Sequence, residues 1–256
     1  MDLNKFLNTF EGDVEEMELN LSIDCVIFTI QENHLKVLVT NLFEGADWML
    51  PGGFVLNSEN TENAATRILH QRTGAENLYL EQFKIFSDPN RFSFKALFEE
   101  MDIKKIGTVD VNMLPMRVIS IGYFALVDFK SLNLTGGEFD EDTSWADIKH
   151  LPKLKFDHAK IIGDAVEALR EELYLKPIAY NLLPEKFTMP ELQKLYEIIL
   201  DKPIERSSFQ KKMLKWDIYE RLKQRREGVA HKRPFLYRFD SKKYNEALNQ
   251  GIRFGI

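Results

Sequence analysis

The sequence has a single cysteine, Cys25, and no apolar run long enough to span a membrane. One cysteine cannot form an internal disulfide, so the sequence favours a reducing compartment and a cytoplasmic location. Cys25 lies in the apolar run SIDCVIFTI, where we expect a small buried side chain rather than a nucleophile. Residues 1–19 are acidic and lack the apolar segment of a signal peptide. These absences predict a protein with no membrane partner.

Charge is distributed unevenly along a chain of otherwise ordinary globular composition. The 256 residues carry a formal net charge of −6. Residues 185–256 hold 17 Lys+Arg and 10 Asp+Glu, a net charge of +7, whereas residues 1–184 hold 17 and 30, a net charge of −13. A basic C-terminal part joined to an acidic body predicts that only the C-terminal part faces a polyanion.

The stretch LPGGFVLNSENTENAATRILHQRTGA, residues 50–75, is predicted to form a strand end, a glycine turn, a loop and a helix. Thr61 is the expected N-cap of the helix, and Gly74 is the expected residue just past its C-terminal end. The layout resembles the Nudix box, G-x5-E-x7-R-E-U-x-E-E-x-G-U, in which U is a bulky aliphatic residue. The residues in register with this pattern are Gly53, Glu59, Arg67, Leu69 and Gly74.

The glutamates that bind metal in the Nudix box are replaced here by Ile68, Gln71 and Arg72. Their spacing of i, i+3 and i+4 puts all three on one helix face. Mg²⁺ requires oxygen ligands, and a cation at Arg72 would repel it. The sequence therefore predicts a Nudix scaffold that is not an enzyme and holds no metal or other cofactor.

Around this stretch the apolar patterns predict several strands and a last helix. The expected strands are Leu21–Ile30, Leu35–Thr40, Leu78–Ile85 and Val118–Val127. Asp157 is the expected N-cap of a helix that starts at His158 and runs to about Leu173. His158 could be a ligand contact or a general base, but a histidine packed locally at the helix start is the favoured interpretation.

Residues 185–256 contain two predicted capping boxes separated by a short turn. Thr188 and Glu191 form the first, T-x-x-E, and Ser207 and Gln210 form the second, S-x-x-Q. Two helices joined so closely predict a helix-turn-helix arrangement. The second helix has an apolar side made of Phe209, Met213 and Trp216, and an opposite side made of Ser208, Lys211, Lys212 and Lys215.

A basic segment and an alternating strand follow this helix. Arg221–Arg226 is rich in cations, Glu227-Gly228 predicts a turn, and Phe235–Phe239 alternates as a strand does. This pattern predicts the β-wing of a winged helix that binds DNA. The predicted DNA-binding residues are Ser207, Ser208, Gln210, Lys211, Lys212, Lys215, Arg225, Arg226, Lys232 and Arg233.

Two further segments resemble one Nudix subgroup, the NrtR-like transcriptional regulators, which include arabinose-responsive members. Phe86–Arg91 resembles F-x-D-P-x-R, and Arg117–Leu126 resembles R-V-V-S-V-A-Y-x-A-L. The intervening residues 92–116 exceed the length expected there, and we expect a lid or an extra helix over the ligand site. Residues 178–188 resemble the junction between the Nudix domain and the winged helix.

The resemblance implies an α+β protein in two domains. A Nudix-fold mixed sheet sandwiched between helices, residues 1–180, would sense a ligand and dimerise, and residues 181–256 would form the winged helix-turn-helix. It also implies a homodimer on a double-stranded DNA operator, switched by a small-molecule effector. The effector would be a sugar, or ADP-ribose or another nucleotide sugar. The expected ligand-binding residues are Glu59, Arg91 and Arg117, because arginine suits phosphate and a carboxylate suits sugar hydroxyls.

Two other functions stay open at the level of the sequence. The first is a Nudix hydrolase of the ADP-ribose pyrophosphatase kind, acting on a nucleoside diphosphate derivative, with Asp88, Glu59 and Glu62 as its candidate Mg²⁺ ligands. The second is a Nudix-like domain that serves only as a dimerisation scaffold. Release of phosphate or AMP would distinguish the hydrolase, and a thermal-shift titration would distinguish the scaffold.

Overall fold

A computed structural model describes residues 17–41, 47–74, 79–91, 118–129, 142–227 and 233–251, without the side chains of residues 17–20, 72 and 73. The chain divides into two compact units. The first consists of Met1–Phe28, Lys36–Ala125 and Lys130–Ala165. The second consists of Thr29–Leu35, Leu126–Phe129 and Val166–Ile256. The predicted domain boundary at residue 180 stays a prediction.

One mixed sheet contains six strands in the order β4-β5-β1-β2-β6, with β3 paired to β1. The strands are β1 (Met17–Gln31), β2 (His34–Asn41), β3 (Gly52–Leu56), β4 (Tyr79–Phe86), β5 (Ile119–Leu126) and β6 (Asp142–Asp147). Glu32 and Asn33 make the turn between β1 and β2 with positive φ angles of 53° and 63°. The four strands expected from the sequence are present, and β6 is a strand that the sequence analysis did not assign.

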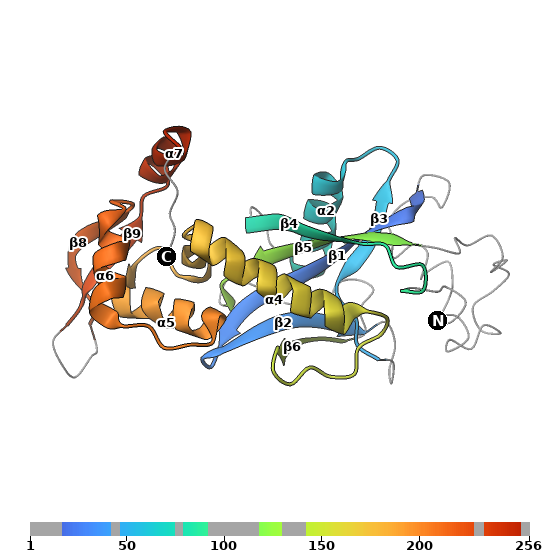
Figure 1. The fold of residues 1–256 in the computed structure, drawn as a ribbon, viewed down its shortest axis with the longest axis horizontal. Coiled ribbons are helices and arrows are strands. Elements are labelled where there is room, and N and C mark those ends of the chain that lie inside the picture. The colour runs from blue at the N-terminus through green and yellow to red at the C-terminus, as the bar shows by residue number, and fades with distance from the viewer. Residues whose placement is uncertain are drawn as a thin grey trace, which may run out of the picture. The chain divides into compact units, whose positions relative to one another are not determined.

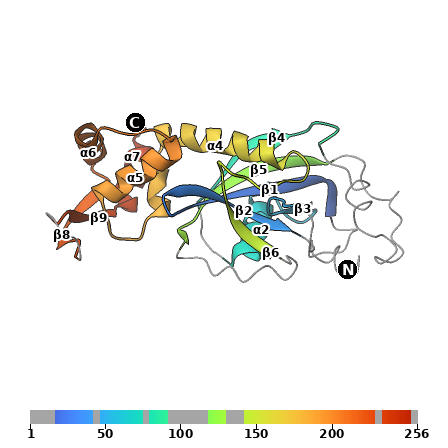
Figure 2. The same cartoon turned by 90° about the horizontal axis from the view of Figure 1, so that it is seen from below.

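Helices lie on both faces of this sheet. Helix α2 (Thr61–Thr73) lies on one face, and the first turns of α4 (His158–Leu175) lie on the other (Figure 1 and Figure 2). The apolar sides of both helices are buried, including Ala65 and Ile68 of α2 and Ile161 and Ala165 of α4. The predicted α+β class, with a Nudix-like sheet between helices, is confirmed. No described helix is both long enough and apolar enough to cross a membrane.

The N-cap predicted for α2 is wrong by one residue. Asn60, not Thr61, is the N-cap, and its side chain accepts a hydrogen bond from the Asn63 amide at 2.8 Å. Asn is as good an N-cap as Thr, so the local sequence offers two neighbouring choices. The predicted end is correct, because Gly74 has a left-handed conformation with φ of 65°. Before the helix, Gly52 permits a close approach, because a Cβ there would lie 2.8 Å from the Ile23 carbonyl oxygen.

The second unit contains a three-stranded sheet and several helices. After the end of α4 come the 3-10 helix η5 (Ile178–Leu182), β7 (Phe187–Thr188), α5 (Met189–Leu200), α6 (Arg206–Lys215), β8 (Tyr219–Arg225), β9 (Phe235–Phe239) and α7 (Ser241–Asn249). The strand order is β7-β9-β8. The core includes Tyr196 and Phe209, whose rings meet edge to face at 5.2 Å. This is a winged helix-turn-helix, as predicted.

The two capping boxes predicted for this unit have different outcomes. The first is confirmed, since Thr188 accepts from the Glu191 amide and Glu191 accepts from the Thr188 amide. The second is wrong, because α6 begins earlier than predicted and Glu205 is its N-cap. The Glu205 carboxylate accepts from the amides of Ser207 and Ser208 at 2.8 and 2.6 Å. A carboxylate also suits the positive end of a helix dipole.

Candidate ligand pocket and nucleic-acid interface

Glu59 and Arg67 join the loop before α2 to the helix itself. The Arg67 guanidinium donates to both carboxylate oxygens of Glu59, at 2.6 Å from Nη2 and 3.1 Å from Nε. The Leu56 amide donates to the same carboxylate at 2.9 Å. Arg67 Nη2 also donates to the carbonyl oxygen of Phe54 at 2.9 Å. These charge-assisted bonds fix the loop between β3 and α2.

The environment of Glu59 keeps its carboxylate ionised. Burial by itself opposes ionisation, but the hydrogen bonds from Arg67 and Leu56 and the charge of Arg67 outweigh it, so the pKa of Glu59 is lowered. The side chain is 12% exposed and does not line the pocket described below. Both of its oxygens already accept hydrogen bonds from Arg67, and a direct contact between Glu59 and a ligand stays a prediction.

The helix positions that carry metal-binding glutamates in a Nudix box have different surroundings here. Ile68 is 1% exposed, and its Cδ1 lies 3.2 Å from where a Cβ on Gly53 would be. Gln71 accepts a hydrogen bond from Arg67 Nη1 at 3.3 Å. Arg72 belongs to α2, and its side chain lies outside the described atoms. At position 68 the side chain is therefore part of the core under the glycine turn.

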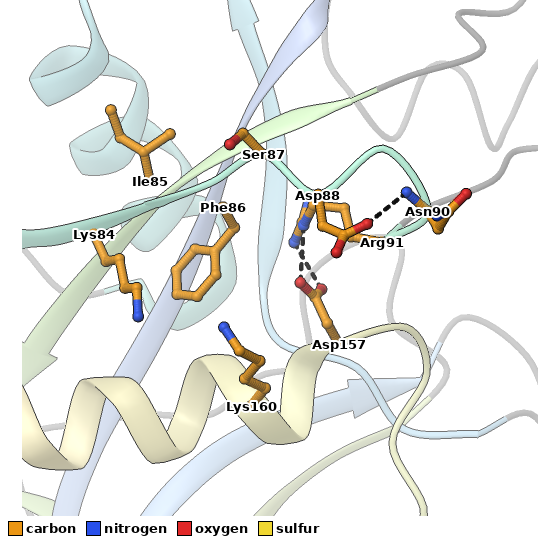
Figure 3. Close-up of a pocket in the computed structure, with 9 residues that line it drawn as sticks. All are labelled: Lys84, Ile85, Phe86, Ser87, Asp88, Asn90, Arg91, Asp157 and Lys160. Carbon is orange, nitrogen blue, oxygen red and sulfur yellow. Dashed lines mark hydrogen bonds and ion pairs between the residues drawn. The ribbon is translucent and has the colours of Figure 1, made fainter.

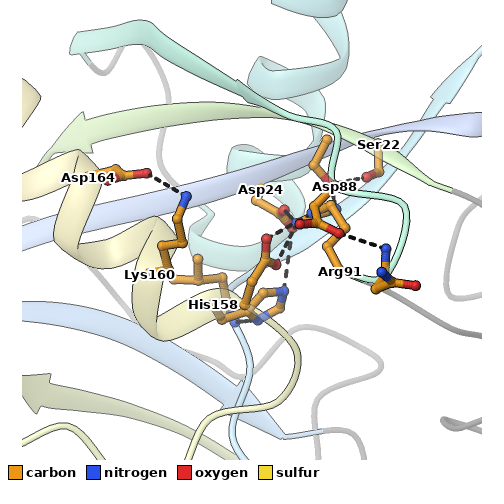
Figure 4. A network of polar contacts seen from close by, with 11 residues as sticks. Ser22, Asp24, Asp88, Arg91, His158, Lys160 and Asp164 are labelled. Carbon is orange, nitrogen blue, oxygen red and sulfur yellow. Dashed lines mark hydrogen bonds and ion pairs between the residues drawn. The ribbon is translucent and has the colours of Figure 1, made fainter.

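Arg91 is the centre of a buried polar network (Figure 4). Its guanidinium donates from Nε and Nη2 to the two carboxylate oxygens of Asp157, at 3.0 and 2.9 Å. Nη2 also donates to Asp24 at 3.0 Å, and Nη1 donates to the Ser120 hydroxyl at 2.6 Å. The side chain is only 3% exposed. Arg91 thus connects β1, β5 and the residue that precedes α4.

His158 completes this network as a neutral side chain. Its Nδ1 accepts a hydrogen bond from the Leu50 amide at 2.9 Å, and its Nε2 lies 3.8 Å from Asp24 Oδ1. Burial lowers the pKa of His158 and outweighs the opposing charges of Asp24 and Asp157. An Nδ1 that accepts a hydrogen bond carries no proton, so the proton resides on Nε2. This geometry fits the favoured interpretation, a histidine packed locally at a helix start.

A pocket of about 290 Å³ lies beside Arg91 (Figure 3). Its lining residues are Lys84, Ile85, Phe86, Ser87, Asp88, Asn90, Arg91, Asp157 and Lys160. The Phe86 ring has the Nζ atoms of Lys84 and Lys160 at 5.8 and 5.3 Å from its centroid. Both lysines pair with Asp164, at 2.8 and 3.3 Å, and remain 47% and 63% exposed. An aromatic floor with cations at the mouth suits a small polar ligand that carries negative charge.

Three predicted positions fall outside the described residues. These are Arg117, an expected ligand contact, Lys232, an expected DNA contact, and residues 92–116, the expected lid. Of the two predicted ligand-binding residues that the structure describes, Arg91 lines the pocket and Glu59 does not.

Helix α6 presents the predicted polar side to solvent. Ser207, Ser208, Lys211, Lys212 and Lys215 are exposed, and Gln210 is half-buried. On the opposite side Phe209 is 3% exposed and Met213 is fully buried. Trp216, predicted as the third core residue, is the half-buried C-cap of the helix. The division of α6 into an anchored side and a cationic side is the one a recognition helix needs.

The predicted arginines of the wing differ in their partners. Arg226 forms an ion pair with Glu191, the residue that completes the capping box of α5. Arg225 stacks on Phe235 and donates to the Arg233 carbonyl oxygen at 2.9 Å. Arg233 is exposed. Arg225 and Arg233 are therefore more available to a polyanion than Arg226.

Known proteins resemble this chain in both units. Residues 179–239 match the family described as the NrtR DNA-binding winged helix domain. The ADPR responsive transcriptional repressor NtrR of Acinetobacter baylyi is 29% identical over 233 residues, which cover 88% of this chain and 84% of the relative. The crystal structure of Shewanella oneidensis NrtR complexed with a 27mer DNA superposes with a TM-score of 0.70 at 25% identity, covering 88% of this chain and 95% of that one.

Residues 179–239 form an NrtR-type winged helix, and the chain as a whole is similar to NrtR proteins. Another relative of this NrtR-like chain is an enzyme, the ADP-ribose pyrophosphatase of Methanocaldococcus jannaschii. It is 29% identical over 156 residues, which cover 59% of the chain and 78% of the relative. The similarity to NrtR proteins includes the winged helix and extends over most of the chain.

Several residues of the pocket and its network in this NrtR-like protein were missed by the sequence analysis. Asp24 and Lys160 lie far apart in the sequence and belong to no motif. Phe86 and Ser120 lie in the two segments Phe86–Arg91 and Arg117–Leu126, but neither segment indicates that these side chains surround Arg91. Asp157 was assigned as a helix cap, and its carboxylate accepts from Arg91.

Proposed function

We propose that this chain is a transcriptional regulator that binds duplex DNA through α6 and the β8–β9 wing and responds to ADP-ribose or a related nucleotide sugar. The observation that carries the proposal is the match to the NrtR winged helix domain over residues 179–239, which include the exposed cationic side of α6. The response to ADP-ribose is proposed from the function of the Acinetobacter baylyi relative. That relative is a repressor, and we propose the same sign of regulation here.

The side chains on α6 support a recognition role. The basic residues Lys211, Lys212 and Lys215 share the exposed side with Ser207 and Ser208. Lysines can neutralise phosphates, and short polar side chains near a helix N-terminus can reach base edges in the major groove. We propose these five residues, together with Gln210, as the recognition set, and Arg225, Lys232 and Arg233 as wing contacts.

The pocket beside Arg91 supports an effector role in the Nudix-like unit. Lys84 and Lys160 offer exposed cations to a phosphate, and Asp88 and Asn90 offer hydrogen bonds to sugar hydroxyls. Arg91 would shape the pocket wall, because its donors are already directed at Asp24, Asp157 and Ser120. Arg117 and Glu59 stay proposed ligand contacts.

We further propose that the protein is not a hydrolase and that it acts as a homodimer. The proposed lack of hydrolase activity is supported by Ile68, which occupies a metal-binding position of the Nudix box and is 1% exposed. A dimer would place two winged helices on one palindromic operator, as two-fold symmetric regulators do. A DNA-bound regulator works in the compartment of the chromosome, which supports the predicted cytoplasmic location.

The test selects operators from a pool of random DNA duplexes and then adds ADP-ribose. We expect one palindromic sequence to be enriched, and ADP-ribose to change its affinity by about 5- to 150-fold, the usual range for coupling between sites. Ribose, arabinose and AMP serve as separate arms that distinguish a sugar effector from a nucleotide sugar.

Matched variants make this selection specific. Replacing Lys211 and Lys212 with alanine should abolish enrichment, whereas Lys202→Gln should leave it unchanged, because the Lys202 side chain already donates to the Tyr174 hydroxyl. A pool that shows no enriched sequence would refute the regulator function. An enriched operator whose affinity no arm changes would refute the effector response alone.

A further inference from the structure

The wing holds an aromatic ring between two arginines. Phe235 of β9 has the Cζ atom of Arg221 3.5 Å from its ring centroid and that of Arg225 3.8 Å from it. Two guanidinium groups this close to one centroid would overlap if they shared a face of the ring. They therefore lie on opposite faces. In the strand ladder, Arg225 pairs with Phe235, and Arg221 pairs with Tyr237 beyond an irregularity in the register.

These two arginines differ from the neighbouring Arg226 and Arg238 in their charge partners. Arg226 is paired with Glu191, and Arg238 is paired with Glu220 at 2.7 Å. Among the residues that the structure describes, no carboxylate lies within ion-pair distance of Arg221 or Arg225. Their charges are therefore available to an outside anion, whereas those of Arg226 and Arg238 are already balanced.

Stacking leaves the donors of a guanidinium free. The ring contacts the flat face of each arginine, and the N–H groups point outward in the plane. Of these donors, Arg225 uses Nη1 for the Arg233 carbonyl oxygen at 2.9 Å. Both arginines are exposed, and Phe235 is half-buried. A planar fork of N–H donors matches phosphate oxygens, and a side chain that is already ordered loses less entropy on binding.

We propose that Phe235 is a positioning residue that holds Arg221 and Arg225 as a pre-ordered pair of phosphate contacts on duplex DNA. This inference rests on the proposed function and adds Arg221 and Phe235 to the residues that serve it. It also removes Arg226 from the set of free cations. Binding at this pair is independent of base sequence, because phosphate contacts carry no direct sequence information.

The first part of the test measures charge. Binding of the full chain to a short mixed-sequence duplex is followed by fluorescence anisotropy over a series of salt concentrations. Arg221→Gln and Arg225→Gln should each reduce the slope of log K against log salt by about 0.9. The matched control replaces Arg238 and Glu220 together with glutamine, which removes a balanced pair from the same strands, and its slope should equal that of the wild type.

The second part measures positioning. Phe235→Leu removes the ring and no charge, so the slope should persist while affinity falls about tenfold at each salt concentration, as expected when two side chains must be ordered on binding. Phe235→Tyr keeps the ring and should keep wild-type affinity. A melting curve accompanies each variant. If the melting temperature of Phe235→Leu is well below that of the wild type, the inference is tested by the salt slopes of the arginine variants and the affinity of Phe235→Tyr.

The outcomes separate this inference from the proposed function. A wild-type chain that binds no duplex at low salt would refute DNA binding as a whole. A wild-type chain that binds, with Arg221→Gln and Arg225→Gln keeping its slope, would refute the arginine contacts. A folded Phe235→Leu variant with wild-type affinity, or a Phe235→Tyr variant that loses affinity, would refute the positioning role.

Discussion

At the scale of single residues, burying the charged guanidinium of Arg91 costs free energy, and its interactions with two carboxylates and a hydroxyl offset that cost. Its guanidinium is 3% exposed and meets Asp24, Asp157 and Ser120. Removing one member of such a buried pair typically costs about 3–5 kcal/mol, because the partner charge is left uncompensated. A substitution of Arg91 would therefore destabilise the fold, and its effect on ligand binding could not be measured separately. Lys84 and Lys160, which are exposed, are the better probes of the pocket.

His158 should make the stability of the protein depend on pH near neutrality. Its pKa is lowered in the folded state by burial, so the unfolded chain binds the proton more readily. The stabilisation is complete above the ordinary histidine value of 6.5 and is lost as the pH falls below it. We expect the free energy of unfolding, measured by urea denaturation, to decrease between about pH 7.5 and 5.

A non-titrating replacement isolates this effect. His158→Asn retains an oxygen that can accept from the Leu50 amide, and its stability should depend less on pH over the same interval. Equal pH dependence in the wild type and the asparagine variant would mean that other groups cause the change.

At the scale of elements, we expect substitutions on the two sides of α6 to have different effects. Those on the exposed side should change DNA binding, and those on the buried side should change stability. Lys211→Ala with Lys212→Ala should reduce the salt slope of operator binding by about 0.9 for each phosphate that is no longer neutralised. Stability should change by no more than about 0.5 kcal/mol, because both side chains are exposed. Met213→Ala should do the opposite and destabilise the protein by about 2–5 kcal/mol, because Met213 is fully buried.

The measurement pairs a melting curve with a salt titration for each variant. A double lysine variant with wild-type affinity and an unchanged slope would show that this side of α6 does not meet DNA. A Met213→Ala variant as stable as the wild type would show that the helix is anchored elsewhere.

Elements with strong local signals were predictable from the sequence, and elements defined by distant pairing were not. The capping box at Thr188 was found because all its parts lie within four residues. The caps of α2 and α6 were misplaced because Asn60 and Glu205 compete with neighbouring Thr61 and Ser207. Strand β6 was missed because its pairing with β2 joins segments about a hundred residues apart.

At the scale of the whole molecule, one assay can separate the hydrolytic function of a Nudix enzyme from the regulatory function that we propose for this chain. We expect the full chain to hydrolyse ADP-ribose far below ordinary enzyme rates of ~1–10³ s⁻¹ in millimolar Mg²⁺ or Mn²⁺. The physical reason is that Ile68, Gln71 and Arg72 supply no carboxylate to the metal.

Glu59→Gln provides the control for trace activity. Loss of a low rate in this variant would assign that rate to the chain, and an unchanged rate would assign it to a contaminant. A wild-type rate within the ordinary range would contradict the non-enzymatic function.

The candidate pocket was harder to predict than the fold. Arg91 stood out because a short motif surrounds it, but its carboxylate partners lie 67 and 66 residues away in the sequence. Asp24, Asp157 and Ser120 come together around the Arg91 guanidinium only in the folded protein, and no local sequence pattern indicates this. The exposed cationic side of α6 was easier to predict, because helical periodicity is contained in ten consecutive residues.

Glu191 serves two structures with one carboxylate. Its Oε2 accepts from the Thr188 amide at the start of α5, and its Oε1 pairs with Arg226, the residue just after β8. Thr188, Glu191 and Arg226 therefore form a single thermodynamic unit. The energies of their individual substitutions will not add, because each removal changes what the shared carboxylate contributes to the other partner. Only a double-mutant cycle can divide the stability of the winged helix between its helix cap and its wing.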